Sequence, residues 1–186
     1  MFNIREIKNF LSKEECLYII DSINKINTWI KYPNDPFWNE RVFDIYSQPQ
    51  DSKLKNIMSL KLKDVKQIIK KEYNENVYAD VFEITRWYPG MSQIPHIDDE
   101  TNRYPDDNNP FIYRKYGAVI YLNDTYDGGE TFYPLQNIKV NPVAGKLIIH
   151  PAGGEEHMHG VTEIKNGMRY TISSFWATDK QHSHEY

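Results

Sequence analysis

Two residues with metal-binding side chains stand two positions apart near the middle of the sequence, at His96 and Asp98. In a β-strand, side chains two positions apart point to the same face of the sheet. The imidazole and the carboxylate would then project together, as two of the three ligands of the facial triad that holds iron(II) and leaves coordination positions open. Because a His-x-Asp pair arises by chance in many proteins, the hypothesis requires a third ligand, a distant histidine that the fold brings close.

The histidines that follow in the sequence are the candidates for this third ligand. They are His150, His157 and His159 in a strand-rich region, with His182 and His184 nearer the end of the sequence. His157 and His159 would share one face of a strand, so each is a rival of the other. We favour His159 because Arg169 follows ten positions later, across an Asn-Gly turn signal at 166–167.

The Asn-Gly signal predicts a hairpin whose register decides which side chains share a face. A two-residue loop would put His159 and Arg169 on opposite faces. A three-residue loop over 165–167, with a left-handed glycine, pairs Arg169 with Glu163 and His159 with Ser173, so that both functional groups face inward. We predict the three-residue loop.

The same register divides the side chains of the last predicted strand into two sets. Those expected to line a pocket with room for a bound anion are Arg169, Thr171, Ser173 and Phe175. Those expected to face away from the pocket and pack beneath the N-terminal helices are Tyr170, Ile172 and Trp176. A sheet covered by helices on one side and lining a polar pocket on the other accounts for this mixture.

Two amphipathic helices are predicted in the first part of the chain. Residues 12–15 fit a capping box, and apolar residues then recur at helical spacing as far as Ile26. A second helix is expected over about 51–73, with one apolar face and one lysine-rich face that we interpret as solvated. The loop from Tyr32 to Trp38 is rich in Pro and aromatic residues. It is either the lip of a substrate site or a loop packed on the core.

From Val77 onward the pattern changes to short apolar segments separated by turn signals. The expected strands cover 77–88, 117–122, 146–150, 157–164 and 169–177. Several short strands at regular spacing favour a sandwich or barrel over a βαβ sheet. Residues 98–109 are expected to form a polar surface loop. We predict a single domain over 1–186, with a helical part at about 1–75 and a strand-rich core at about 77–178.

Composition limits the classes of partner and compartment. The 186 residues carry 22 Lys and Arg against 26 Asp and Glu, a net charge of −4 that argues against a nucleic-acid partner. No run approaches the ~18 apolar residues of a membrane span, so no membrane partner is expected. The single cysteine, Cys16, excludes an intramolecular disulfide, and we expect a cytoplasmic location. Mean hydropathy is −0.69 although aromatics reach 14%, which predicts a partly polar interior.

Several motifs, occurring in order, resemble the prolyl 4-hydroxylase-type 2-oxoglutarate and iron(II) oxygenases. They are Glu83–Gly90, His96–Asp98, Val119–Asn123, Gly128–Thr131, and His159 followed by Gly167–Tyr170. The similarity extends over about 11–178. It implies an α+β, mainly β fold: a double-stranded β-helix (jelly roll, cupin-like) with the N-terminal helices packed on the outside of the major sheet.

The resemblance also assigns roles to residues of the site. It implies that His96, Asp98 and His159 bind iron(II), and that Arg169 binds the distal carboxylate of the cosubstrate 2-oxoglutarate. Collagen-type members commonly carry Lys at the position of Arg169, which places this chain nearer the arginine-using branch. Arg can hold a carboxylate through two hydrogen bonds, whereas Lys cannot.

Four further residues complete the predicted site. Tyr121 is similar to the family tyrosine that shares the distal carboxylate, and Tyr88 to the one near the metal end of the cosubstrate. Trp38 and Arg41, in and after the aromatic loop, are the candidate substrate-binding residues.

The resemblance implies hydroxylation of a prolyl residue in a peptide or protein. Dioxygen is consumed, 2-oxoglutarate is decarboxylated to succinate and CO2, and L-ascorbate is a candidate additional cofactor. Two alternatives stay open. One is the same chemistry on a lysyl side chain, a free amino acid or another small molecule; the other is a non-enzymatic jelly-roll binding module. No oligomeric state is predicted.

Overall fold

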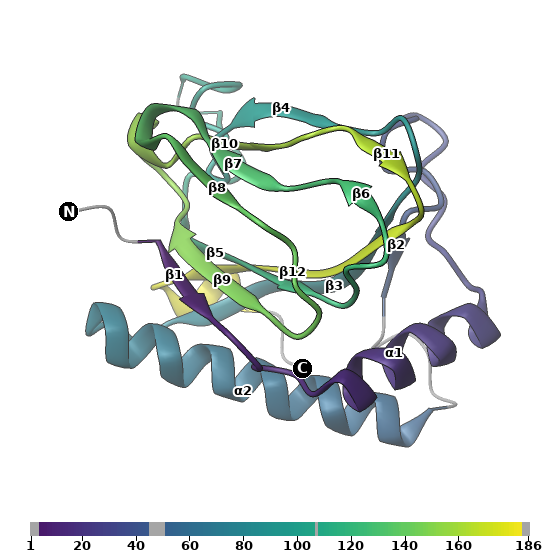
Figure 1. Cartoon of the computed structure of the whole chain (residues 1–186). Coiled ribbons are helices and arrows are strands. Elements are labelled where there is room, and N and C mark those ends of the chain that lie inside the picture. Colours follow the sequence, from purple (N-terminus) through teal and green to yellow (C-terminus); the bar gives the residue numbers. More distant parts are fainter. Residues whose placement is uncertain (1–3, 45–50, 107, 184–186) are drawn as a thin grey trace.

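The computed structural model describes residues 4–44, 51–106 and 108–183. In these ranges two antiparallel sheets face each other, and two helices lie along the outer side of the larger sheet (Figure 1). The larger sheet has the order β1 (Arg5–Ile7), β9 (Leu147–Pro151), β5 (Arg114–Tyr121), β12 (Arg169–Ala177), β3 (Tyr78–Trp87) and β2 (Val42–Phe43). The smaller sheet has the order β4 (Gln93–His96), β10 (His159–Val161), β7 (Thr131–Tyr133) and β8 (Ile138–Val140). β6 (Asp127–Gly128) and β11 (Ile164–Asn166) pair in a short two-stranded ribbon where the chain passes between central strands of the two sheets, from β5 to β7 and from β10 to β12.

Both helices begin where the sequence places a cap. α1 (Lys13–Ile26) follows Ser12, whose hydroxyl accepts from the Glu15 backbone at 3.1 Å while the Glu15 carboxylate accepts from the Ser12 backbone at 2.7 Å. α2 (Ser52–Tyr73) follows Asp51, whose carboxylate accepts from the backbone of Leu54. Each cap satisfies N–H groups that have no partner within the helix.

The apolar faces of the two helices meet the larger sheet in one core. Its buried members include Cys16, Ile19, Ile23, Leu54, Met58, Val65 and Ile69 from the helices, and Phe82, Ile84, Ile172 and Trp176 from the sheet. Burial of apolar side chains is the main force that holds the helices on this face. The predicted α+β, mainly β arrangement, with N-terminal helices outside the major sheet, is confirmed.

The predicted hairpin between β10 and β12 is wrong. β10 pairs with β4 and β7 in the smaller sheet, whereas β12 lies between β3 and β5 in the larger one. Glu163 therefore does not face Arg169: the Glu163 carbonyl accepts from Gly129 at 3.3 Å, and Arg169 pairs with Trp87. The turn carries the chain from one sheet to the other. Its glycine, Gly167, does adopt the expected left-handed conformation, with φ of 75°.

The predicted faces of the last strand hold although its predicted partner does not. Tyr170, Ile172 and Trp176 belong to the helix-covered core. On the inner side, the hydroxyl of Thr171 lies 2.8 Å from that of Thr85 on β3, and Phe175 lines a cavity. The alternation of side chains along a strand fixes these faces whichever strands lie beside it.

The first part of the chain contributes more than helices. Its short strands β1 and β2 form the two edges of the larger sheet, against β9 and β3. The predicted boundary at about 75–77 separates the helices from the long strands. The larger sheet nevertheless contains strands from both sides of this boundary. None of the helices in the described ranges has the length and apolar character needed to cross a lipid bilayer.

Candidate metal centre and adjoining cavity

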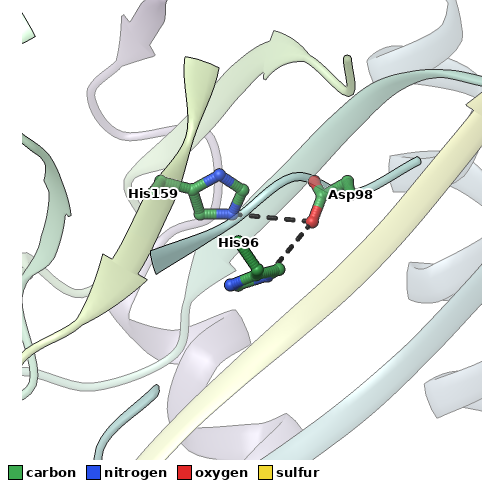
Figure 2. A group of neighbouring side chains, drawn as sticks. All are labelled: His96, Asp98 and His159. Atoms are coloured by element: carbon green, nitrogen blue, oxygen red, sulfur yellow. Dashed lines mark ion pairs between the residues drawn. The ribbon is translucent and has the colours of Figure 1, made fainter. Parts of the chain in front are cut away.

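Three side chains converge at one end of the space between the sheets (Figure 2). His96 ends β4, Asp98 follows two residues later, and His159 begins β10 directly opposite His96. The Nε2 atoms of both histidines lie 3.5 Å from Oδ1 of Asp98. One ligand atom from each of the three residues lies within 4.8 Å of the other two. Pairing of β4 with β10 thus brings together residues 63 positions apart (159 − 96 = 63).

The other candidate histidines lie outside this group. His157 falls in a 3-10 turn over 155–157, where its Nδ1 lies 2.8 Å from the carbonyl of Gly153. His182 stacks on Tyr113 with ring centres 3.8 Å apart. His184 lies outside the described residues. The choice of His159 over its neighbour His157 therefore agrees with the geometry.

Backbone carbonyls fix the tautomers of the two histidines. Nδ1 of His96 lies 3.1 Å from the carbonyl of Ile94, and Nδ1 of His159 lies 3.0 Å from the carbonyl of His157. Because a carbonyl only accepts, each Nδ1 carries a proton in these bonds. Nε2 is then the atom of each ring that can give a lone pair to a metal once it carries no proton, as a metal-ligating histidine requires.

Charge in the group suits a bound cation. Burial lowers the pKa of His159 to about 3, so the imidazole is neutral at pH 7. Burial by itself would raise the pKa of Asp98, but the imidazoles of His159, His96 and His150 outweigh it and hold that pKa well below its usual range. Burial opposes protonation of His96 too, yet the hydrogen bond with Asp98 raises its pKa overall. Two imidazoles and one carboxylate are the donor set of an iron(II) facial triad. A bound cation would take the place of the proton that His96 donates to Asp98.

The second carboxylate oxygen of Asp98 faces the larger sheet. Nε2 of the fully buried His150 on β9 lies 3.6 Å from Oδ2 of Asp98 and has no hydrogen-bond partner. A Cβ at Gly117 on β5 would lie 2.1 Å from that oxygen, so the absence of a side chain there leaves room for Asp98. The sequence analysis did not predict that His150 or Gly117 lies beside Asp98. A glycine inside a strand is itself a signal of close approach by another group.

A buried cation lies farther along the same space. Arg169 is only 2% exposed, and its guanidinium donates to the carbonyl of Gly129 at 3.2 Å. Within the described ranges no carboxylate lies at ion-pair distance from it. A buried charge without an opposite charge is costly, so the site fits an anionic group such as a carboxylate.

The predicted tyrosines take different places around this cation. The ring of Tyr121 has its centre 5.3 Å from the Arg169 guanidinium, and its hydroxyl bonds Thr131 at 2.6 Å. Tyr88 is half-buried with its ring 5.3 Å from the guanidinium of Arg86, so its predicted place near the metal end stays a prediction. Tyr126, which the sequence analysis missed, flanks Gly129 beside Arg169. Its hydroxyl is buried, and burial raises its pKa well above the usual range although Arg169 opposes this rise.

A cavity of about 780 Å³ opens from the metal-ligand group towards the aromatic loop. His96 and Asp98 line it, as do Phe37 and Trp38 of the loop. The predicted substrate residue Trp38 therefore faces the space where a substrate would lie. The loop thus lines the cavity while Phe37 and Trp38 also pack on the buried cluster around Trp87, so the second reading that the sequence left open is present, and a substrate at the loop stays a prediction.

Arg41 is not in the cavity wall. It is fully buried, donates to the carbonyls of Arg86 at 2.9 Å and Phe37 at 2.5 Å, and lies 4.2 Å from the ring centre of Trp87. Burial, and then the charge of Arg169, lower its pKa to about 10. The geometry places Arg41 behind the aromatic loop as its support, while its predicted contact with substrate stays a prediction.

The comparisons with known proteins agree with this geometry. A family model described as "2OG-Fe(II) oxygenase superfamily" matches residues 82–177. Prolyl 3-hydroxylase 2 of Mus musculus is 30% identical over 88 residues, which are 45% of this chain and 12% of that protein. Prolyl 3-hydroxylase 1 of Homo sapiens is 31% identical over 78 residues, 39% of this chain and 10% of that protein. The chain thus spans only about a tenth of the length of these curated relatives.

Two solved structures show the same fold. The viral collagen prolyl hydroxylase of Paramecium Bursaria Chlorella virus-1, in its 2OG complex, has a TM-score of 0.68 at 19% identity, covering 96% of this chain and 97% of that one. A Trichoplax adhaerens prolyl hydroxylase, in complex with a hypoxia inducible factor peptide fragment, has a TM-score of 0.73 at 17% identity, covering 98% and 86%. The predicted double-stranded β-helix is confirmed.

Proposed function

The chain belongs to the 2OG-Fe(II) oxygenase superfamily, and from that membership we propose that it hydroxylates a prolyl residue in a peptide or protein. The proposal rests on one observation: two sites with different chemistry lie in the same buried space. A donor set for iron(II) lies at His96, Asp98 and His159, and the unpaired guanidinium of Arg169 lies farther in. A dicarboxylate held by Arg169 would be presented to the metal.

The roles of the chain's own residues follow from their places. His96, Asp98 and His159 hold iron(II), and Arg169 holds the distal carboxylate of 2-oxoglutarate through charge-assisted hydrogen bonds. Tyr121 supports that end of the cosubstrate, and Tyr88 is proposed to lie near its metal end. When bound, iron(II) and 2-oxoglutarate supply the oxidising chemistry, in which dioxygen converts a substrate C–H to C–OH and 2-oxoglutarate to succinate and CO2. The protein positions these groups and keeps water from them.

Support for a prolyl substrate comes from two directions. The curated relatives named above are prolyl hydroxylases, as are the two solved structures. The cavity beside the metal-ligand group has aromatic residues at Phe37, Trp38, Phe111 and Phe175, surfaces on which an apolar pyrrolidine ring can pack. The complete triad and the unpaired Arg169 favour an enzyme over a binding module of the same fold.

The proposal is tested by turnover with defined peptides. The purified chain is supplied with iron(II), 2-oxoglutarate and dioxygen, and peptides with and without proline are compared by mass spectrometry. We expect gain of one oxygen on proline with equimolar succinate, and loss of 2-oxoglutarate binding in Arg169→Ala. Succinate release stimulated by lysyl peptides or free amino acids, with proline peptides inert, would replace the prolyl assignment with the alternative substrate class.

We further propose L-ascorbate as an additional cofactor and the cytoplasm as the location. Ascorbate follows from the family resemblance, and its test is longer-lasting turnover on its addition. The cytoplasmic proposal is supported by the buried free thiol of Cys16, since an intracellular reducing compartment preserves thiols and iron(II). Cell fractionation with an antibody against the chain tests it.

A further inference from the structure

Glu83 is a mostly buried carboxyl group in the wall of the cavity beside the metal-ligand group. It lies on β3 between Phe82 and Ile84, which point to the helix-covered core, so its own side chain points to the cavity side. On the neighbouring strand it pairs with Ser173. Among the described residues, none forms a hydrogen bond or an ion pair with the Glu83 carboxyl group.

Among the described residues, Arg114 is the cation whose charge acts on Glu83, and its guanidinium already has other partners. Arg114 donates from Nε to Asp80 at 3.0 Å, and its Nη1 lies 3.4 Å from the carbonyl of Asp98. The rings of Phe111 and Phe175 lie over the same guanidinium, with centres at 4.1 Å and 3.9 Å. The charge of Arg114 is thus compensated before Glu83 is counted.

At Glu83, burial and the nearby carboxyl groups outweigh the charge of Arg114. Burial raises the pKa of Glu83 to about 7, Arg114 opposes this rise, and Asp44 and Asp80 add to it. Two carboxyl groups and one guanidinium thus act on Glu83 with opposite sign. A cation brought in from outside would lower this pKa again and remove the cost of a buried, ionised carboxylate.

The cavity offers a place for such a cation. Tyr32 lies on the same side, since its pKa is raised by burial and then by Glu83, Asp44 and Asp35. Its ring can contribute a cation–π contact beside the carboxylates. At the rim, the charges of Glu100 and Arg103 lie 3.4 Å apart and offset each other, whereas Glu83 has no ion-pair partner among the described residues.

We infer that Glu83 binds the side-chain ammonium or guanidinium of a basic residue that flanks the oxidised residue of the substrate. The inference rests on the proposed function and narrows its substrate class to basic peptide segments. Glu83 is a specificity-determining residue in this reading: it holds the neighbour of the reacting residue and takes no part in the oxidation.

The test uses a matched pair of peptides and the holoenzyme. The first pair consists of acetylated peptides that contain Lys-Pro or norleucine-Pro and are otherwise equal in sequence. In a second pair the variable residue follows proline. Each peptide is titrated anaerobically into the chain loaded with iron(II) and 2-oxoglutarate. Calorimetry gives each Kd. We expect the lysine peptide to bind about tenfold more tightly in one of the two pairs, the size of one charge-assisted hydrogen bond. In Glu83→Gln, which keeps the size of the side chain, the ratio falls to about one.

Two variants isolate the charge at this position. Glu100→Gln removes a carboxylate from the same cavity and is expected to keep the lysine preference, because Arg103 already compensates Glu100. Glu83→Lys is expected to reverse the preference, so that a glutamate peptide binds more tightly than the lysine peptide. A lysine preference that survives in Glu83→Gln overturns the inference. The inference is also overturned if the unaltered chain binds both peptides equally, or binds neither of them.

The same peptides separate failure of the inference from failure of the proposed function. Hydroxyproline formed equally from lysine and norleucine peptides, at equal Kd, supports the oxygenase and rejects the role of Glu83. Tight binding of the lysine peptide that depends on Glu83, without hydroxyproline, supports the cation site and rejects prolyl hydroxylation.

Discussion

At the scale of single residues, Asp98 holds the centre of the site because its two oxygens face different groups. Oδ1 lies 3.5 Å from Nε2 of His96 and of His159, whereas Oδ2 lies 3.6 Å from Nε2 of His150 and close to Gly117. The carboxylate therefore offers a metal one oxygen only. If Asp98 gave a bound metal one oxygen only, the metal would keep coordination positions for cosubstrate and dioxygen.

The close packing at Gly117 makes a sharp prediction. Gly117→Ala would place Cβ 2.1 Å from Oδ2 of Asp98, so the carboxylate must move. We expect iron(II) affinity to fall about 10- to 100-fold, the range found when a group that orients a ligand is lost. Anaerobic iron(II) titration measures the change, with circular dichroism to verify folding. Lys115→Ala, at an exposed position of the same strand, is the matched control; equal affinities in the two variants would contradict the prediction.

A second prediction concerns the two neighbouring histidines. His159→Ala removes a ligand and should weaken iron(II) binding by more than about 100-fold, beyond the loss expected for an orienting residue. His157→Ala should bind iron(II) like the unaltered chain, because its ring bonds Gly153 outside the ligand group. Metal analysis after gel filtration distinguishes them. Loss of iron in His157→Ala with retention in His159→Ala would reverse the assignment.

The buried carboxyl of Glu83 predicts how stability depends on pH. Its pKa is raised from an ordinary 4.5 to about 7 in the folded chain, so the folded state keeps a proton that the unfolded state has released. The unfolding free energy should therefore fall as pH rises between these values, by at most about 1.4 kcal/mol per pH unit from this group. Urea unfolding of the unaltered chain and of Glu83→Gln across this range measures it. Parallel curves for the two chains would show that Glu83 titrates normally.

At the scale of elements, the helices support the sheet from the side away from the cavity. Ser12→Ala removes the hydroxyl that caps α1 and should lower the unfolding free energy by about 1 kcal/mol. Affinities for iron(II) and 2-oxoglutarate should stay unchanged, because α1 packs on the outer face of the sheet. Urea unfolding and ligand titration of the same variant test both statements. A matching loss of ligand affinity would mean that the outer face governs the site.

How far the sequence predicts these elements depends on how local the signal is. The cap at Ser12 and the alternation of Tyr170 and Thr171 depend on neighbours in the chain, and both were predicted. The partner of β12 was not, because an Asn-Gly turn specifies a reversal but not whether the chain returns to the same sheet. Gly167 has the expected conformation while the chain crosses to the other sheet.

The same distinction applies within the site. The motif at His96 and Asp98 points to the metal-ligand group, because the two residues lie two positions apart, at the end of β4 and in the turn that follows it. The positions of Tyr126 and Glu83 could not be predicted in this way. Each gains its place from contacts between distant segments, with Arg169 beside one and the aromatic loop near the other. A local motif can identify reactive residues, whereas the set of residues that line a cavity depends on the whole fold.

At the scale of the whole molecule, the interior between the sheets combines polar ligand sites with two small apolar clusters and has no continuous apolar core within the described residues. Arg169, Thr171, His150 and His159 are all less than 9% exposed. A fold with such an interior gains stability when these sites are filled, since anything bound only by the folded state stabilises it.

Removal of the ligands should therefore be visible in thermal unfolding. At about 100 times the Kd, iron(II) with 2-oxoglutarate should add about 2.7 kcal/mol, which corresponds to about 5–10 °C in Tm for a chain of this size. Anaerobic thermal scans with the two ligands and with a chelator measure the difference. His159→Ala should show almost no shift; an equal shift in that variant would mean that the ligands bind elsewhere.

The position of β12 has a consequence for synthesis on the ribosome. β12 follows all the other strands of the described chain, yet in the larger sheet it lies between β3 and β5. Until it emerges, those two strands have no common neighbour, and their facing edges stay open to other chains. A nascent chain halted before Arg169 would thus lack the middle of its main sheet. We expect the metal-ligand group to take its final geometry only after β12 has joined its two neighbours, although His96, Asp98 and His159 all precede Arg169 in the sequence.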